Sequence, residues 1–209
     1  MPNAACAHPR HAAERHERRT AVPKARALPR GGAPNGRGGE MNSAPPGDRA
    51  RVTVGVAVPP HDAFRLFTEE IELWWRRGPR FRNAPGDSGL IALEPRLGGR
   101  VFESSSAGAR EHVVEIGRIR VWDPPRRLLF DWRARNFAPA ERTEVEVVFE
   151  PSASGTRVTV THSGWAALRA DHPVRHGKVG AAHSREVGLW WGALLSAWRL
   201  HCSGPPDDR

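Results

Sequence analysis

Residues 181–201, AAHSREVGLWWGALLSAWRLH, carry the strongest periodic pattern in the chain. The large apolar residues in this segment recur every three or four positions: Val187, Trp190, Trp191, Leu194, Leu195 and Trp198. Side chains at these spacings share one side of an α-helix, so the pattern predicts a long C-terminal helix with a broad apolar face. Such a face must be buried against a second layer of structure.

The preceding segments supply that layer, because they alternate apolar and polar residues as half-buried antiparallel strands do. The predicted strands are 51–58, 90–93, 100–104, 111–122, 128–132, 143–150 and 156–162. The last two are joined by the turn sequence SASG and share one apolar face, formed by Val145, Val147, Phe149, Val158, Val160 and His162. Residues 61–75, which follow two prolines, predict one further helix. We therefore expect an α+β helix-grip fold, in which a curved antiparallel sheet wraps around the long C-terminal helix.

The basic composition is a poor guide to a partner. The 209 residues, enough for one domain, include 32 Lys and Arg against 23 Asp and Glu, a net charge of +9. Only two of the basic residues are lysines, and Arg, Ala, Gly and Pro, all abundant, have GC-rich codons. The one dense basic run (Arg76, Arg77, Arg80 and Arg82) follows a predicted helix and is typical of a solvated loop. We expect no nucleic-acid partner.

Several other classes are excluded by what the sequence lacks. No apolar run reaches 18 residues, so no membrane span is expected, and without a short apolar core near the N-terminus no secretory signal is expected either. Cys6 and Cys202 form no pattern of disulfides, which fits the cytoplasm. Phosphate-binding, hydrolase and metalloprotease motifs are absent, so no cofactor is expected. His172 and His176 have helical metal-ligand spacing, but Pro173 disfavours a helix there, and we expect no metal.

The two ends differ from the body in composition. Residues 1–48 contain no Phe or Trp and cannot bury enough apolar surface to fold, so we expect them to be disordered, or to precede a true start at Met41. The folded domain is expected over 49–203, followed by a disordered C-terminus, 204–209.

A ligand cavity is expected between sheet and helix. His162 shares the apolar face of its strand, and strict alternation over 111–122 points Glu115 inward. Eight tryptophans exceed what a small core needs and can line a pocket. The alternatives stay open: His162 as a hydrogen-bonded core histidine, Glu115 at a wet edge, and the tryptophans as simple filling. The candidate ligand-binding residues are Trp74, Trp75, Phe102, Glu115, Trp132, Phe149, His162, Trp165, Trp190 and Trp191.

Several segments in order carry a family resemblance: PPHDAFRLFT, WW, LGGR, VWDPPRRLLFDW, SGTRVTVTHSGW and the closing Trp-rich helix. Over about 51–201 the chain resembles the activator of heat-shock protein 90 ATPase homologue-like family, within the SRPBCC (START-like) superfamily. The resemblance implies a helix-grip fold with a cavity between sheet and helix. It also implies a choice among hydrophobic-ligand carriers, polyketide aromatase/cyclases and stimulators of a chaperone ATPase, with no shared residue set. Residues 1–48 do not match the separate chaperone-docking domain of the eukaryotic activators.

Three hypotheses follow. The first is a non-enzymatic binding module for a small hydrophobic or aromatic ligand. The second is an aromatase/cyclase- or hydrolase-like enzyme in the same cavity, with His162 and Glu115 as its acid and base. The third is a partner of a heat-shock protein 90 chaperone. A homodimer is compatible with each of them.

Overall fold

A computed structural model describes residues 48–83, 89–107 and 110–204 of the chain. Apart from Asp48 and Gly204, the predicted tails 1–48 and 204–209 lie outside the described residues. The strands are β1 (Ala50–Val56), β2 (Leu90–Leu93), β3 (Arg100–Ala107), β4 (Arg110–Asp123), β5 (Arg127–Trp132), β6 (Thr143–Ser152) and β7 (Gly155–Ser163). The helices are α1 (Pro60–Thr68), α2 (Ile71–Trp74) and α3 (Gly180–Cys202), with 3₁₀ turns at Trp165–Ala167 and Pro173–Arg175.

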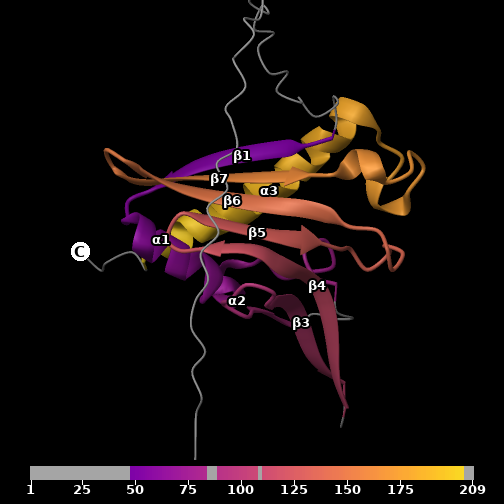
Figure 1. Cartoon of the computed structure of the whole chain (residues 1–209), viewed down its shortest axis with the longest axis horizontal. Coiled ribbons are helices and arrows are strands. Elements are labelled where there is room, and N and C mark those ends of the chain that lie inside the picture. The colour runs from indigo at the N-terminus through magenta and orange to yellow at the C-terminus, as the bar shows by residue number, and fades with distance from the viewer. Residues whose placement is uncertain (1–47, 84–88, 108–109, 205–209) are drawn as a thin grey trace, which may run out of the picture. The chain divides into compact units, whose positions relative to one another are not determined.

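The strands form one antiparallel sheet in the order β1-β7-β6-β5-β4-β3-β2. The sheet curves, and α3 runs across one of its faces (Figure 1). β1 reaches its place at the edge by pairing with β7, with Val52 opposite Val160. The predicted helix-grip α+β fold is confirmed.

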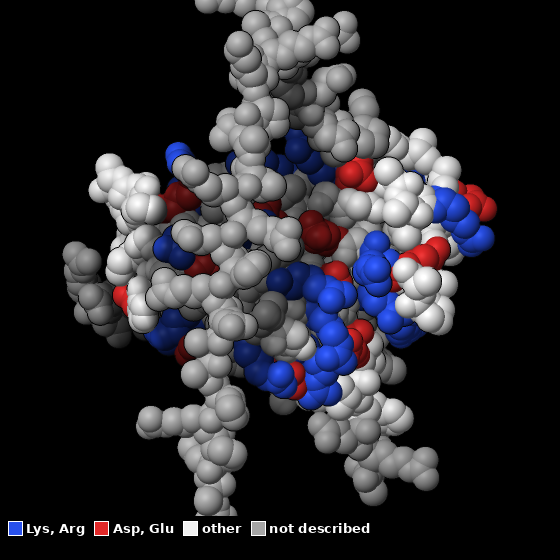
Figure 2. All heavy atoms as spheres, in the orientation of Figure 1, with Lys and Arg blue, Asp and Glu red and all other residues white. Residues whose placement is uncertain are grey.

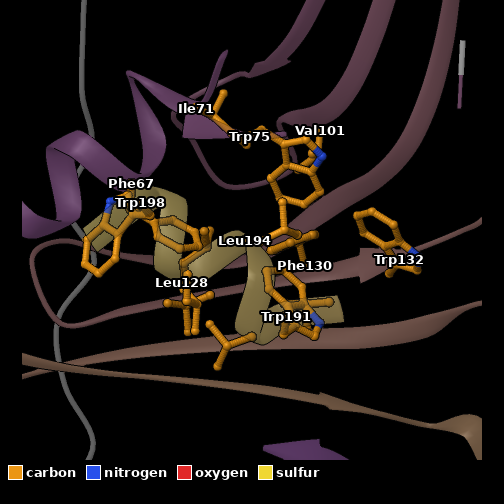
Figure 3. Close-up of a cluster of buried hydrophobic side chains, with 14 of the residues drawn as sticks. Phe67, Ile71, Trp75, Val101, Leu128, Phe130, Trp132, Trp191, Leu194 and Trp198 are labelled. Carbon is orange, nitrogen blue, oxygen red and sulfur yellow. The ribbon is translucent and has the colours of Figure 1, made fainter. Parts of the chain in front are cut away.

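The core fills the space between α3 and the sheet. Trp191, Leu194, Leu195 and Trp198 of α3 are buried, and so are the inward residues of β6 and β7 that alternation predicts. Figure 3 shows Phe67 and Trp198 at one end of this cluster and Trp132 at the other. The rings of Phe67 and Trp198 meet edge to face, with centroids 5.6 Å apart.

The single helix predicted over 61–75 is wrong, because the chain breaks it at Glu69 and Glu70. The Thr68 hydroxyl donates to the carbonyl of Phe64, which ends α1 with a side chain bonded to its own backbone. After the break Trp74 turns back, and its Nε1 donates to the carbonyls of Leu66 and Phe67. The break therefore lets the indole cover the last turn of α1.

The prediction that Glu115 points inward is also wrong. Strand β4 has two register shifts: Val101 pairs with Gly117 while Phe102 pairs with Glu115, and Ile119 pairs with Phe130 while Val121 pairs with Leu129. Each shift inserts one unpaired residue and reverses the alternation beyond it. Ile116 and Ile119 are therefore buried. The Glu115 carboxylate lies outside, 40 % exposed, where both its oxygens accept hydrogen bonds from Arg118.

The outer face of the sheet carries opposite charges on neighbouring strands. Arg127 of β5 bonds Glu146 of β6, and Arg157 of β7 bonds Glu150 of β6. On the face seen in Figure 2, basic side chains lie beside acidic ones. None of the described helices combines the length and hydropathy that a membrane crossing requires.

Candidate functional site

A pocket of about 920 Å³ opens between the sheet and the first half of α3. Strands β5 and β7 supply Trp132 and His162, and α3 supplies His183, Glu186, Val187 and Trp190. Three connecting segments complete the wall: 79–83 after α2, 134–136 after β5, and the turn region that contributes Trp165, Val174 and His176. This volume is within the range of small-molecule sites, and aromatic rings form much of the wall.

His162 is held in one protonation state at the base of this wall. An indole N–H can only donate, so the 3.1 Å bond from Trp191 Nε1 makes His162 Nδ1 an acceptor. The ring proton is then on Nε2, which donates to Thr143 Oγ1 at 2.8 Å. The Thr143 hydroxyl in turn donates to the carbonyl of Trp132. Burial lowers the pKa of His162 to about 3, so it is a neutral, fully bonded core histidine and has no nitrogen free for proton transfer.

Indole groups hold the segment that forms one side of the mouth. Trp75 Nε1 donates to the carbonyl of Phe81, and Trp190 Nε1 donates to the carbonyl of Arg80, both at 2.9 Å. The Trp190 ring also stacks on Phe81 and packs against Trp132. The tryptophans of this region therefore both form the wall and position the loop above it.

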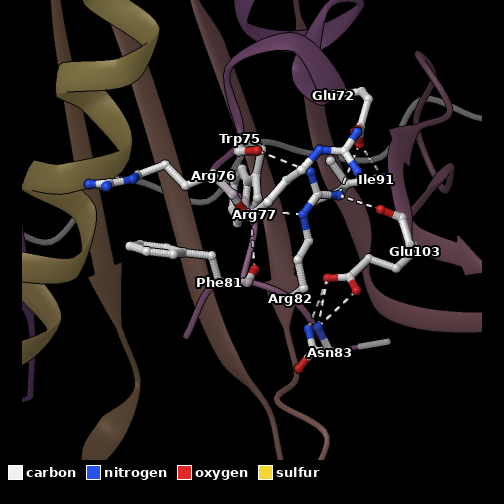
Figure 4. A network of polar contacts seen from close by, with 10 residues as sticks. Glu72, Trp75, Arg76, Arg77, Phe81, Arg82, Asn83, Ile91 and Glu103 are labelled. Carbon is white, nitrogen blue, oxygen red and sulfur yellow. Dashed lines mark hydrogen bonds and ion pairs between the residues drawn. The ribbon is translucent and has the colours of Figure 1, made fainter. Parts of the chain in front are cut away.

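A buried polar network secures the other end of the same loop (Figure 4). The Arg82 side chain is only 2 % exposed, and its guanidinium bonds the Glu72 carboxylate and the carbonyls of Trp75, Arg76 and Gly89. The buried carboxylate of Glu103 accepts from the backbone N–H of Asn83 with both oxygens. Because Arg82 and Glu103 are buried and the network satisfies them with several partners, it holds the loop in one geometry.

Two buried nitrogens at the pocket wall lack partners within the described chain: Nε2 of His183 and Nε1 of Trp165. Their rings contact each other edge to face at 4.6 Å. Burial and the positive charge of Arg175 lower the pKa of His183 to about 4, so this imidazole is neutral at physiological pH. Buried polar atoms without partners are uncommon and mark this corner of the pocket as chemically distinct.

The structure separates the ten candidate ligand-binding residues into four groups. Four line the pocket: Trp132, His162, Trp165 and Trp190. Trp75 and Trp191 are buried directly behind it and contact those rings, whereas Trp74 and Phe149 pack in the core away from it. Phe102 lies under the guanidinium of Arg100, on the opposite side of β3 from buried Val101, and Glu115 is on the outer face. Whether the four pocket residues bind a ligand remains a prediction.

Several pocket residues had no convincing signal in the sequence. Arg80 and Arg82 belong to the basic run assigned to a solvated loop, yet Arg82 is buried, and Arg77 and Arg82 both bond Glu72. Asn83, Arg135 and Phe81 lie in irregular segments, where periodicity gives no prediction. His183 is one of four histidines within residues 162–183, a grouping that by itself predicts no site.

His172 and His176 have the sequence spacing of metal ligands, but the structure gives the two side chains different neighbours. His172 bonds Glu141, while His176 lies at the pocket. Within residues 48–83, 89–107 and 110–204, no three His, Cys, Asp or Glu side chains gather as metal ligands would.

Comparison with known proteins agrees with this architecture. The family model described as "Activator of Hsp90 ATPase homolog 1-like protein" matches residues 57–183, more than half of the chain. The chain belongs to this family. No curated protein matches the sequence at a significant level.

Solved structures share the fold of this chain at low sequence identity. A heat-shock protein 90 activator from Plasmodium falciparum is 20 % identical, with a TM-score of 0.50, over 76 % of this chain and 99 % of that one. A protein from Cytophaga hutchinsonii solved in solution is 11 % identical, with a TM-score of 0.52, over 74 % and 93 %. A protein of the dynemicin biosynthetic locus is 16 % identical, with a TM-score of 0.50, over 76 % and 48 %. At identities this low, the likeness establishes a common fold alone, because one fold can serve many functions.

Proposed function

We propose that this protein is a cytoplasmic, non-enzymatic binding module for a small hydrophobic or aromatic molecule. The observation that carries the proposal is the pocket of about 920 Å³ walled by Trp132, Trp165 and Trp190. Flat aromatic rings around an open volume stabilise an apolar ligand through burial and ring contacts. The pinned loop 79–83 supports the proposal further, because a preformed wall does not have to be ordered when the ligand binds.

Binding is favoured over catalysis because the suggested acid–base pair is not assembled. Glu115 is on the outer face with Arg118, and both nitrogens of His162 are engaged. A general base needs a free nitrogen or carboxylate oxygen within reach of the substrate. His162 therefore acts as a fixed part of the wall.

The test uses the uncharged dye N-phenylnaphthylamine, whose emission rises in apolar surroundings. We expect saturable binding to the wild-type protein and loss of most of it in Ala134→Trp, because Ala134 lines the pocket and an indole there fills it. The matched control is Ala181→Trp, the same change at an exposed position of α3 outside the pocket lining. Dye binding that is absent, or unchanged by Ala134→Trp, contradicts the proposal.

A second candidate is stimulation of a heat-shock protein 90 ATPase, which the description of the matching family favours. The measurement is the ATPase rate of the chaperone from the same organism with and without an excess of this protein. An unchanged rate excludes this role. Light scattering on the same sample distinguishes a monomer from a homodimer.

A further inference from the structure

The charged groups at the pocket mouth are unevenly balanced. Three arginines line the pocket, Arg80, Arg82 and Arg135, against one carboxylate among the described lining residues, that of Glu186. Lys178 donates to Glu186 at 2.9 Å, and this hydrogen bond holds the pKa of Glu186 below its usual value. Arg80 also approaches the same carboxylate, at 3.4 Å. The one negative charge of the lining is therefore already shared by two cations.

Of the three arginines, Arg82 is not available to a ligand, because its guanidinium already bonds Glu72 and three backbone carbonyls. Arg135 differs. Its backbone N–H donates to Asn83 Oδ1 at 3.3 Å, which ties this residue to the pinned loop, but its exposed guanidinium has no partner among the described residues. A planar guanidinium presents five N–H donors that match a carboxylate, sulfonate or phosphate.

The inner wall also favours negative charge. The unpartnered Nε1–H of Trp165 is a donor, and the neighbouring His183 lies in a positive field, because Arg175, His176 and Lys178 add to burial in lowering its pKa. Glu186 opposes that field only in part. Electropositive surroundings of this kind disfavour a bound cation and stabilise a bound anion.

We infer that the pocket takes an anionic amphiphile, whose aromatic or aliphatic body lies against Trp132, Trp165 and Trp190 and whose acidic group binds Arg135. This inference rests on the proposed binding function and adds a charge preference to it. The tryptophan wall determines that the body is apolar. Arg135 at the mouth determines that the ligand is an acid.

The test compares two probes with the same ring system. Anilinonaphthalene sulfonate carries a negative charge, and N-phenylnaphthylamine carries none. We expect the sulfonate to bind the wild type more tightly. Arg135→Gln should weaken sulfonate binding about ten-fold, since it removes a charge-assisted hydrogen bond, and should leave the neutral probe unchanged. Unchanged binding of the neutral probe also shows that the variant folds.

The control is Arg185→Gln, which removes an exposed arginine of α3 that does not line the pocket and should affect neither probe. Sulfonate binding should weaken with added salt in the wild type and less so in Arg135→Gln. Equal affinity for the two probes, or an Arg135→Gln variant that binds the sulfonate as the wild type does, overturns the charge preference while the binding function stands. If the neutral probe does not bind, or if Ala134→Trp leaves its binding unchanged, the probe does not enter the pocket. That result contradicts the binding function itself.

Discussion

Trp191 Nε1 donates a hydrogen bond to His162 Nδ1 at 3.1 Å, joining the central helix to the strand that it covers. Because an indole N–H has no acceptor role, this one contact determines the tautomer of the imidazole. The relay then continues through the Thr143 hydroxyl to the carbonyl of Trp132. Every polar atom of the relay is satisfied, so a histidine can be buried in an aromatic core without a charge.

Removing the Thr143 hydroxyl, which links His162 to the carbonyl of Trp132, should destabilise the protein. In Thr143→Val the shape of the side chain is kept, but His162 Nε2–H loses its acceptor inside the core. We expect the free energy of unfolding to fall by about 1–3 kcal/mol, the cost of an unsatisfied buried donor. Urea denaturation measures it.

The control is Ser196→Ala. The Ser196 hydroxyl also donates a hydrogen bond, to the carbonyl of Gly192 at 2.7 Å, but this side chain of α3 is exposed, so water replaces the lost bond. Its effect should be close to zero. Equal effects at the two positions would show that the relay contributes nothing of its own.

Stability should decline on mild acidification through His162 and His183. Their pKa values in the folded protein, about 3 and about 4, lie below the ordinary value of 6.5. The unfolded chain therefore binds two protons that the folded chain does not. The free energy of unfolding loses about 2 kcal/mol from these groups between about pH 6 and pH 5.

The measurement is urea denaturation at several pH values in this window. His183→Gln should remove about half of the decline, because one of the two groups is gone. His61→Gln is the control, since His61 is exposed. A pH dependence identical in wild type and His183→Gln would show that His183 is not buried as described.

Gly117 allows β4 and β5 to approach. A Cβ at this position would lie 1.6 Å from the carbonyl oxygen of Asp131, a contact that only a shift of the backbone relieves. We expect Gly117→Ala to destabilise the protein by about 2 kcal/mol or more.

The control for this change is Gly188→Ala in α3, where a Cβ meets nothing within 4 Å. Alanine is the better helix residue, so this variant should gain about 0.5–1 kcal/mol. Thermal unfolding of both variants gives the comparison, and opposite signs are expected. A neutral Gly117→Ala would mean that the strands can separate at low cost.

Arg82 should matter for both stability and binding. Arg82→Ala removes the partner of four acceptors, and a broken buried ion pair typically costs about 3–5 kcal/mol. Since Arg82 fixes the loop 79–83 at the mouth, affinity for N-phenylnaphthylamine should fall as well. Arg82→Lys should recover only part of either loss, because an ammonium cannot reproduce the planar fork.

Exposed Arg185 serves as the comparison, and Arg185→Ala should change neither property. Denaturation and dye titration are run on the same preparations. If Arg82→Ala is measurably destabilised but binds the dye with normal affinity, the hydrogen bonds of Arg82 contribute to stability alone. That result contradicts the proposed role of Arg82 in holding the loop at the pocket mouth.

The local sequence determined the layers of this protein. Period-two alternation in β6 and β7 and three-to-four spacing in α3 depend only on backbone geometry, and the faces they predict are the buried ones. The same rule placed His162 on the concave side. The other three candidates that line the pocket, Trp132, Trp165 and Trp190, were predicted only as members of a large set of tryptophans.

Only the tertiary structure decided which groups meet across the pocket. The two register shifts in β4 depend on how its neighbours pair, so alternation alone pointed Glu115 to the wrong side. Arg82 is buried because Glu72 and three carbonyls from separate segments converge on it, and no local pattern encodes that convergence. The same holds for Arg135, whose position at the mouth depends on Asn83, 52 residues earlier in the chain. Periodicity is a property of a single helix or strand. A site is formed by side chains from several helices, strands and loops, and long-range packing decides which of them come together.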